Sequence, residues 1–177
     1  MVLIYVLMFV LLLSTELLYF RLADKFNIID KPNERSSHTS VVLRGGGVIF
    51  SLAMVAWAAM MGVQGECNAV LGYVPFLVGL IVVAVVSFVD DVKSLPDSVR
   101  LVAQFGAMAL MFWSMGIMQW NMWWVVPIAL IVCVGATNVI NFMDGINGIT
   151  AGYSLAVLLP LIVLNNNLRY ELIIKYF

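Results

Sequence analysis

The sequence predicts an all-α fold in which several helices cross a membrane. Hydrophobic residues make up 63% of the chain, charged residues make up 11%, and the mean hydropathy is +1.04. Soluble domains carry about 25% charged residues, and a chain of 177 residues could not bury this much apolar surface in one core. A bilayer solvates apolar helices directly, so the composition predicts a polytopic membrane protein.

Six apolar segments approach the roughly 20 residues that a helix needs to cross the hydrocarbon core. We predict helices at Val2–Phe20, Gly46–Val63, Leu71–Val89, Val99–Met118, Trp123–Ala136 and Ile149–Leu164. Only Gln119–Met122 separates the fourth from the fifth, which predicts a tight helical hairpin. A seventh apolar segment begins near Leu172. The first segment lacks a basic flank and a small-residue cleavage site, so we expect a transmembrane helix there and no removable signal peptide.

The distribution of Lys and Arg predicts the orientation. Seven of the nine basic residues lie in segments 21–44 and 90–100, and the alternate loops, 64–70 and 119–122, contain none. The positive-inside rule then places these two segments in the cytoplasm and the N-terminus outside. Counting helices puts Thr137–Gly148 on the cytoplasmic side as well. Arg169 and Lys175 fall near the outer side and weaken this bias without reversing it.

Two common functional signals are missing from the sequence. The net charge of −1 gives no electrostatic indication of a nucleic-acid partner, and we predict none. Cys67 and Cys133 lie in different segments and match no metal-binding spacing. Function must therefore be sought in the three polar segments that are expected to share the cytoplasmic face.

The first polar segment joins an irregular loop to a glycine run. It contains Asp30-Lys31-Pro32-Asn33, Arg35-Ser36-Ser37-His38 and Arg44-Gly45-Gly46-Gly47. The planar guanidinium of Arg suits phosphate oxygens, and glycines that enter a helix let its N-terminus approach an anion. One interpretation is a phosphate site with Arg35, His38 and Arg44. The other is a basic loop that sets topology, followed by small residues for helix packing.

The second polar segment begins with two adjacent carboxylates, Asp90 and Asp91, directly after an apolar run. Ionisable residues at membrane depth are costly, so a pair at this boundary indicates a function. Adjacent residues of a helix point about 100° apart, so the two carboxylates need not do the same work. Lys93, Asp97 and Arg100 follow closely. The alternative is a pair of acidic residues that simply flanks a helix.

The third polar segment carries Asn138, Asn141 and Asp144 at spacings of three residues. These side chains would share one face if the segment is helical. Their oxygens suit a hard cation such as Mg²⁺, which takes one or two protein ligands together with water and substrate phosphates. Gly145 and Gly148 would let the backbone turn towards a ligand. Capping of two helices, the alternative, explains one Asn and one Gly but not the whole set.

With these three motifs in this order, the chain resembles the polyprenyl-phosphate N-acetylhexosaminyl-1-phosphate transferases, of the glycosyltransferase family 4 type. The resemblance covers essentially the whole chain. The Arg-Ser-Ser-His and Arg-Gly-Gly-Gly motifs are closer to the branch that starts O-antigen or capsule glycans, with undecaprenyl-phosphate GlcNAc-1-phosphate transferases, than to the peptidoglycan branch.

The resemblance implies a reaction and its participants. An N-acetylaminosugar-1-phosphate would pass from a UDP-sugar to undecaprenyl phosphate, with release of UMP, at the cytoplasmic face of the bacterial inner membrane. Mg²⁺ is the implied cofactor, with Mn²⁺ as an alternative, and a homodimer is compatible with the resemblance. For the chemistry we expect a single displacement, and a covalent aspartyl intermediate is the rival.

The resemblance also assigns roles to residues of this sequence. It implies catalytic roles for Asp90, Asp91 and Asp144, with the aspartate pair near the lipid phosphate, and metal ligation by Asn141. It implies substrate contacts for Lys31, Asn33, Arg35, His38, Arg44, Gly45, Gly46, Asn138 and Asn147.

Family members have ten or eleven helices and are about twice as long. Residues 1–177 are therefore expected to form a single transmembrane domain, the N-terminal portion of a larger transferase. The second metal-binding Asp and the His-rich loop of the family have no counterpart here, and His38 is the single histidine. A truncated, non-catalytic fragment that binds lipid phosphate or a partner is the alternative function. A transporter is a third, disfavoured because its polar site would lie at the membrane midplane.

Overall fold

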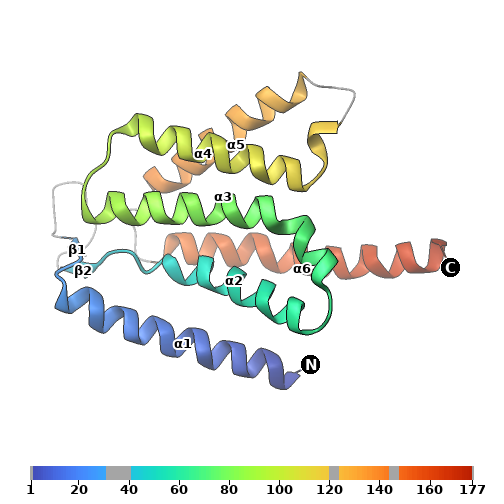
Figure 1. The fold of residues 1–177 in the computed structure, drawn as a ribbon, viewed down its shortest axis with the longest axis horizontal. Coiled ribbons are helices and arrows are strands. Elements are labelled where there is room, and N and C mark those ends of the chain that lie inside the picture. The colour runs from blue at the N-terminus through green and yellow to red at the C-terminus, as the bar shows by residue number, and fades with distance from the viewer. Residues whose placement is uncertain (1, 31–40, 120–123, 144–147, 177) are drawn as a thin grey trace. The chain divides into compact units, whose positions relative to one another are not determined.

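The computed structural model describes residues 2–30, 41–119, 124–143 and 148–176, and over these it is almost entirely helical (Figure 1). The elements are α1 (Val2–Lys25), β1 (Ile29–Asp30), β2 (Val42–Leu43), α2 (Val48–Val63), α3 (Cys67–Val92), α4 (Asp97–Ser114), the 3-10 helix η1 (Ile117–Gln119), α5 (Val125–Met143) and α6 (Ile149–Tyr176). The all-α prediction is confirmed.

Three of the described helices are long and apolar enough to cross a membrane. They are α1 over Val6–Lys25, α3 and α5, whereas α2 and the Ile149–Asn165 part of α6 are apolar but shorter. The helix α4 belongs to neither set, because Asp97, Arg100 and Gln104 lower its hydropathy. The chain is a membrane protein; six spans and an external N-terminus stay predictions.

Several helices run past the ends that hydropathy predicts. The helices α1, α3 and α5 continue to Lys25, Val92 and Met143, because polar residues at a membrane boundary can keep a helical backbone. The predicted seventh apolar segment near Leu172 is continuous with α6, which runs unbroken to Tyr176, and a seventh span stays a prediction. Three asparagines, Asn165 to Asn167, lower the hydropathy there, but no Gly or Pro ends the helix. The predicted hairpin at Gln119–Met122 lies mostly outside the described residues.

The chain forms two compact units. The first contains α1 to α4, both strands and α5 as far as Thr137, and the second contains the end of α5 from Asn138 together with α6. In the first unit, α1 packs on α2, α2 on α3 and α3 on α4, each antiparallel to the next (Figure 1). The ends of α1 and α3 and the beginnings of α2 and α4 therefore lie together. We call this the basic end, since it carries Lys25, Arg44, Lys93 and Arg100.

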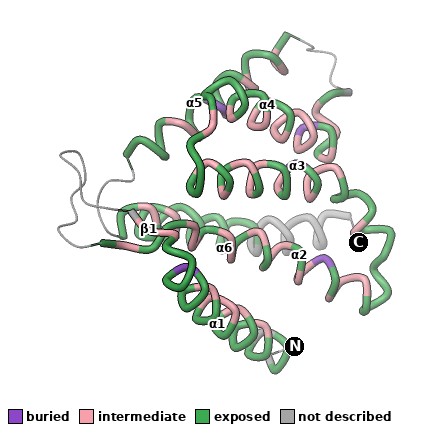
Figure 2. The backbone as a smooth tube through the Cα atoms, turned by 60° about the vertical axis from the view of Figure 1, so that its left-hand side comes forward, coloured by how far each residue is buried: buried purple, intermediate pink, exposed green. Residues whose placement is uncertain are grey.

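Close packing is confined to a few places. At Gly79 on α3, an added Cβ would lie 3.0 Å from the Cα and carbonyl oxygen of Ala107 on α4, so a glycine lets these two helices touch. Among the described residues, the buried hydrophobic side chains are Ala23, Ala58, Phe112 and Val134 (Figure 2). The other apolar side chains described are half-buried or exposed, as expected for helices that lipid covers.

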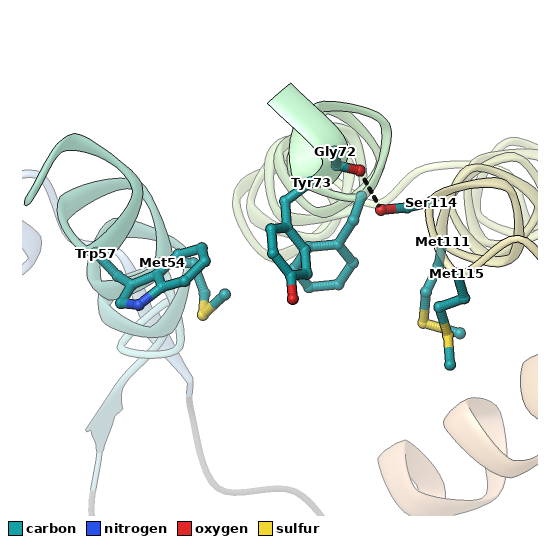
Figure 3. Close-up of a pocket in the computed structure, with 8 residues that line it drawn as sticks. Met54, Trp57, Gly72, Tyr73, Met111, Ser114 and Met115 are labelled. Atoms are coloured by element: carbon teal, nitrogen blue, oxygen red, sulfur yellow. Dashed lines mark hydrogen bonds between the residues drawn. The ribbon is translucent and has the colours of Figure 1, made fainter. Parts of the chain in front are cut away.

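A large pocket lies at the opposite end from the basic end, between α2, α3 and α4. Its volume is about 740 Å³, and Met54, Trp57, Tyr73 and Met111 are among the residues that line it (Figure 3). The Ser114 hydroxyl donates to the Gly72 carbonyl at 2.7 Å and joins α4 to α3 beside it.

Candidate active site

The end of α1 and the small sheet bring Arg44 to the basic end. Asn27 ends α1 in the left-handed conformation, with φ of +55°, a common way to terminate a helix. The two strands then pair antiparallel, with Ile29 opposite Leu43. The Arg44 N–H extends this ladder by donating to the Ile28 carbonyl at 3.0 Å. Residues far apart in the sequence thus place Arg44 beside the end of α1.

Two hydrogen bonds then tie Arg44 to the neighbouring helices. The Tyr19 hydroxyl of α1 donates to the Arg44 carbonyl at 2.5 Å, and Nη1 of Arg44 donates to the Asp91 carbonyl at 3.3 Å. A cation is stabilised at the C-terminal end of a helix, where carbonyl oxygens point outwards. The end of α3 therefore favours Arg44 electrostatically as well as by this bond.

The turn after Arg44 requires glycines, because its backbone lies very close to side chains of the neighbouring helices. Gly45 has φ of +80°, and a Cβ there would collide with the Tyr19 hydroxyl and lie 3.0 Å from the Phe88 ring. A Cβ on Gly46 would lie 3.2 Å from Oε1 of Glu16. The close backbone approach that the glycine run predicts is therefore observed, and it is made to the side chains of α1 and α3.

The first turn of α2 is already hydrogen-bonded to the glycine run. The N–H groups of residues 48–50 donate to the carbonyls of residues 45–47 at 3.1 to 3.3 Å. These amides are thus engaged within the chain, and the Arg44 side chain is the stronger candidate donor to an anion. Substrate contacts from Gly45 and Gly46 stay predictions.

The two adjacent carboxylates lie in the last turn of α3 but have different surroundings. Oδ1 of Asp90 accepts a hydrogen bond from the Leu95 N–H at 2.7 Å, and its Oδ2 lies 3.5 Å from Nη1 of Arg100. The Asp90 side chain is 22% exposed. Asp91 is exposed and lies within electrostatic reach of the Tyr19 hydroxyl. Asp90 therefore fixes the connection from α3 to α4, whereas Asp91 lies on the Arg44 side.

Arg100 has a second acidic neighbour. It also lies 3.6 Å from Oδ1 of Asp97, one turn earlier on α4, but that carboxylate is 92% exposed. Exposed ion pairs contribute little to folding stability, about 0.2 to 1 kcal/mol. The contact with Asp90 is the one that joins two helices.

The third motif is placed on a helix. Asn138 and Asn141 lie in the last turns of α5, three residues apart and therefore on one face. The shared face expected if this segment is helical is therefore present for Asn138 and Asn141, because α5 continues to Met143. These two residues belong to the second unit.

The structure thus brings together part of the predicted site. Arg44, Gly45, Gly46, Asp90 and Asp91 meet at the basic end of the first unit, and Asn138 and Asn141 lie together on α5. The other predicted site residues fall outside the described ranges: Lys31, Asn33, Arg35, His38, Asp144 and Asn147.

Two residues of this cluster were not predicted from the sequence, Glu16 and Tyr19 of α1. Glu16 is the ionisable side chain within the apolar part of α1 that precedes Arg21, and such a residue is itself a sign of function. Tyr19 follows three residues later and so lies on the same helical face. That combination was the signal available in the sequence.

The donor chemistry of the site can be compared with the needs of Mg²⁺. In the described part of the chain, no three His, Cys, Asp or Glu side chains gather into a metal-ligating group. Mg²⁺ often needs only one or two protein ligands, because waters and phosphates supply the rest. A hard oxygen ligand of the right type is offered in each unit by itself, by the Asp91 carboxylate in the first and by the Asn141 amide in the second.

Comparison with known proteins gives two findings. Residues 73–176 match the model of glycosyl transferase family 4, and this range includes Asp90, Asp91, Asn138 and Asn141. The chain is also 26% identical over 145 residues to a probable undecaprenyl-phosphate N-acetylglucosaminyl 1-phosphate transferase of Bacillus subtilis (strain 168). That alignment covers 76% of this chain and 39% of the relative, so the chain spans well under half of its length. No solved structure matches the chain.

Proposed function

This chain belongs to glycosyl transferase family 4, and we propose that it transfers an N-acetylaminosugar-1-phosphate from a UDP-sugar to undecaprenyl phosphate, releasing UMP. The observation that carries the proposal is the cluster at the basic end. There, Arg44 is held against α1 and α3 with the exposed Asp91 beside it. The Arg44 cation at a membrane boundary suits a lipid phosphate that arrives from the bilayer, because it offsets the repulsion between that phosphate and the Asp91 carboxylate.

The chemistry joins two anions, so positioning and charge neutralisation are the main tasks. Arg44 serves the second task, since its guanidinium forms paired hydrogen bonds with phosphate oxygens. A phosphate monoester has a second pKa of about 6 and is mostly ionised at neutral pH. The need for a base is therefore small, and we assign to Asp91 the removal of any last proton. Asp90 keeps the α3–α4 connection in place.

We propose Mg²⁺ as the cofactor, with Asn141 as its protein ligand and Mn²⁺ as an alternative. When bound, such an ion neutralises charge on the pyrophosphate and stabilises the leaving group. The proposal also includes a catalytic role for Asp144 and substrate contacts from the loop before Arg44.

The name of the Bacillus relative supports undecaprenyl phosphate as acceptor and N-acetylglucosaminyl 1-phosphate as the transferred group, and we propose the UDP-sugar as its donor. We further propose that the reaction takes place at the cytoplasmic face of a bacterial inner membrane. Its product would start an O-antigen or capsule glycan. The reaction is proposed as a single displacement, in which the lipid phosphate attacks the β-phosphorus. A labelled adduct trapped with UDP-sugar alone would instead establish the covalent route.

The direct test is an assay of membranes that contain the chain. They are incubated with Mg²⁺, undecaprenyl phosphate and a panel of UDP-sugars, and UMP release is measured. Arg44→Ala should lower the rate at least tenfold, Arg44→Lys should recover part of it, and Lys25→Ala at the same end serves as the matched control. Absence of UMP with every sugar contradicts transfer by this chain.

The alternative is a non-catalytic membrane module that binds lipid phosphate. It needs only the anion-binding turn at Arg44, which the first unit supplies by itself. Arg44-dependent retention of labelled undecaprenyl phosphate without UMP release would support this second function.

A further inference from the structure

Glu16 lies within the part of α1 that is long and apolar enough to cross a membrane, Val6–Lys25. A carboxylate at this depth is costly, so its neighbours should show what offsets the cost. The polar residue beside it, Thr15, satisfies its hydroxyl within its own helix by donating to the Leu11 carbonyl at 2.8 Å. The Glu16 side chain instead extends to another helix.

The Glu16 carboxylate faces the beginning of α2. Its Oε1 lies so close to Gly46 that a Cβ on this glycine would be 3.2 Å away. The next residue, Gly47, is the N-cap of α2, and it provides no side-chain hydrogen bond to the first turn of that helix. A carboxylate of α1 therefore lies beside a helix N-terminus whose own cap has no side chain.

This arrangement is electrostatically favourable for both partners. The N-terminus of a helix carries a partial positive charge and stabilises a carboxylate, most strongly in a partly buried site. Glu16 is half-buried on an apolar helix, so salt and water screen the attraction less than at the surface. One interpretation of the glycine run places an anion at this N-terminus, and the anion found beside it is the chain's own carboxylate.

Tyr19 contacts the same turn from the same helix. Its hydroxyl donates to the Arg44 carbonyl, and Glu16 lies within electrostatic reach of that hydroxyl. Residues three apart lie on one helical face. One face of α1 therefore holds the turn at two points, with Tyr19 at Arg44 and Glu16 at Gly46.

We propose that Glu16 is a positioning residue, which holds the turn from Arg44 to Gly47 against α1 and so keeps the Arg44 guanidinium in one direction. Its effect on the reaction rests on the proposed function, in which Arg44 neutralises a phosphate. A small displacement of such a group lowers the rate strongly, because the reaction depends on geometry. The carboxylate also leaves the phosphate to the Arg44 side chain, since it repels a second anion from the N-terminus of α2.

The first test follows the turn itself and needs no enzymatic activity. Amide hydrogen exchange of residues 46–50 is measured by mass spectrometry on the chain in lipid nanodiscs. Glu16→Gln keeps the size of the side chain but removes its charge, and we expect exchange in this segment to become about threefold faster or more. Thr15→Val, on the same helix, is the matched control and should leave exchange unchanged, because the Thr15 hydroxyl bonds to its own helix.

The second test asks whether Glu16 acts through Arg44. UMP release at saturating undecaprenyl phosphate is measured for Glu16→Gln in the unaltered chain and in an Arg44→Ala background. A positioning residue loses its effect once the group that it positions is gone, so we expect a loss of about threefold or more in the first case and of less than about 1.5-fold in the second. A residue that only stabilises the fold would lower both rates by the same factor. Glu16→Asp, which keeps the charge on a side chain one methylene shorter, should recover part of the rate.

Three results would overturn the inference. They are unchanged exchange at residues 46–50 in Glu16→Gln, an equal increase of that exchange in Thr15→Val, and equal losses of UMP release in the two backgrounds. If Glu16→Gln lowers the amount of chain in the membrane, Glu16→Asp replaces it in both comparisons, because its shorter side chain draws the charge away from Gly46.

The positioning role and the proposed function can fail independently. Faster exchange in Glu16→Gln, without UMP release by the unaltered chain from any UDP-sugar, would support the contact with the turn and contradict the transferase. UMP release by the unaltered chain, with exchange that Glu16→Gln does not change, would contradict the positioning role alone.

Discussion

Asp90 and Asp91 are neighbours in sequence, yet the fold gives them different tasks. Asp90 is partly buried and holds Leu95 and Arg100 across the α3–α4 connection. Asp91 is exposed, and its backbone carbonyl receives Arg44. The helical rotation of about 100° between adjacent residues is the physical reason. The resemblance alone would treat the pair as one catalytic unit, whereas the hydrogen bonds divide it.

Replacing each carboxylate should therefore give different losses. Asp90→Ala leaves the Leu95 N–H without its acceptor, and we expect a loss of about 1 to 3 kcal/mol in stability. Asp91→Ala should lower UMP release at least tenfold, because it removes the carboxylate on the Arg44 side of the site. Thermal unfolding in detergent and the UMP assay measure the two effects. Arg100→Gln should reproduce part of the Asp90 loss, and an unchanged midpoint in Asp90→Ala would contradict this assignment.

Gly45 offers a second residue-scale prediction. Gly45→Ala should destabilise by about 1 kcal/mol or more, because φ is +80° and the new methyl group collides with the Tyr19 hydroxyl. Gly47→Ala is the control, since a Cβ there meets nothing within 4 Å. Tyr19→Phe should recover part of the loss in a double-mutant cycle read by thermal unfolding. Equal midpoints for the two alanine variants would refute the collision.

At the scale of elements, the antiparallel pairing of α3 with α4 depends on a small contact. Gly79→Leu would drive a side chain into the backbone of Ala107, and overpacking of this kind costs about 1 to 3 kcal/mol. Gly106→Leu on α4 is the matched control. It makes the same change in side-chain size, but a Cβ at Gly106 meets nothing within 4 Å. We expect a lower unfolding midpoint for Gly79→Leu only. A similar decrease in both variants would point to a general effect of leucine.

The helices could be predicted from the sequence because lipid selects long apolar segments. Their ends could not, since α5 continues through Asn138 and Asn141 to Met143 on backbone hydrogen bonds that hydropathy does not record. The contact of Tyr19 with Arg44 joins residues 25 positions apart. No local pattern specifies that contact, because it depends on how α1, the strands and α2 meet.

At the scale of the whole molecule, the residues that match the family model include only part of the cluster at the basic end. The match begins at residue 73, within α3, whereas Arg44, Gly45 and Tyr19 lie before it. The basic end therefore combines the matched Asp90 and Asp91 with a turn that the match does not cover. In the proposed function the acceptor phosphate would depend on both parts.

The orientation of the molecule gives the last prediction. The loop before α3 and the basic end lie at opposite ends of the same helices, so one must be outside if the other is cytoplasmic. The Lys and Arg distribution places Cys67, which is exposed, outside. In a Cys133→Ser background, a membrane-impermeant maleimide should label Cys67 in intact spheroplasts. Lys93→Cys, in a chain that also carries Cys67→Ser, should be labelled only after the membrane is permeabilised. The reverse pattern would invert the topology and move the Arg44 cluster away from cytoplasmic UDP-sugars.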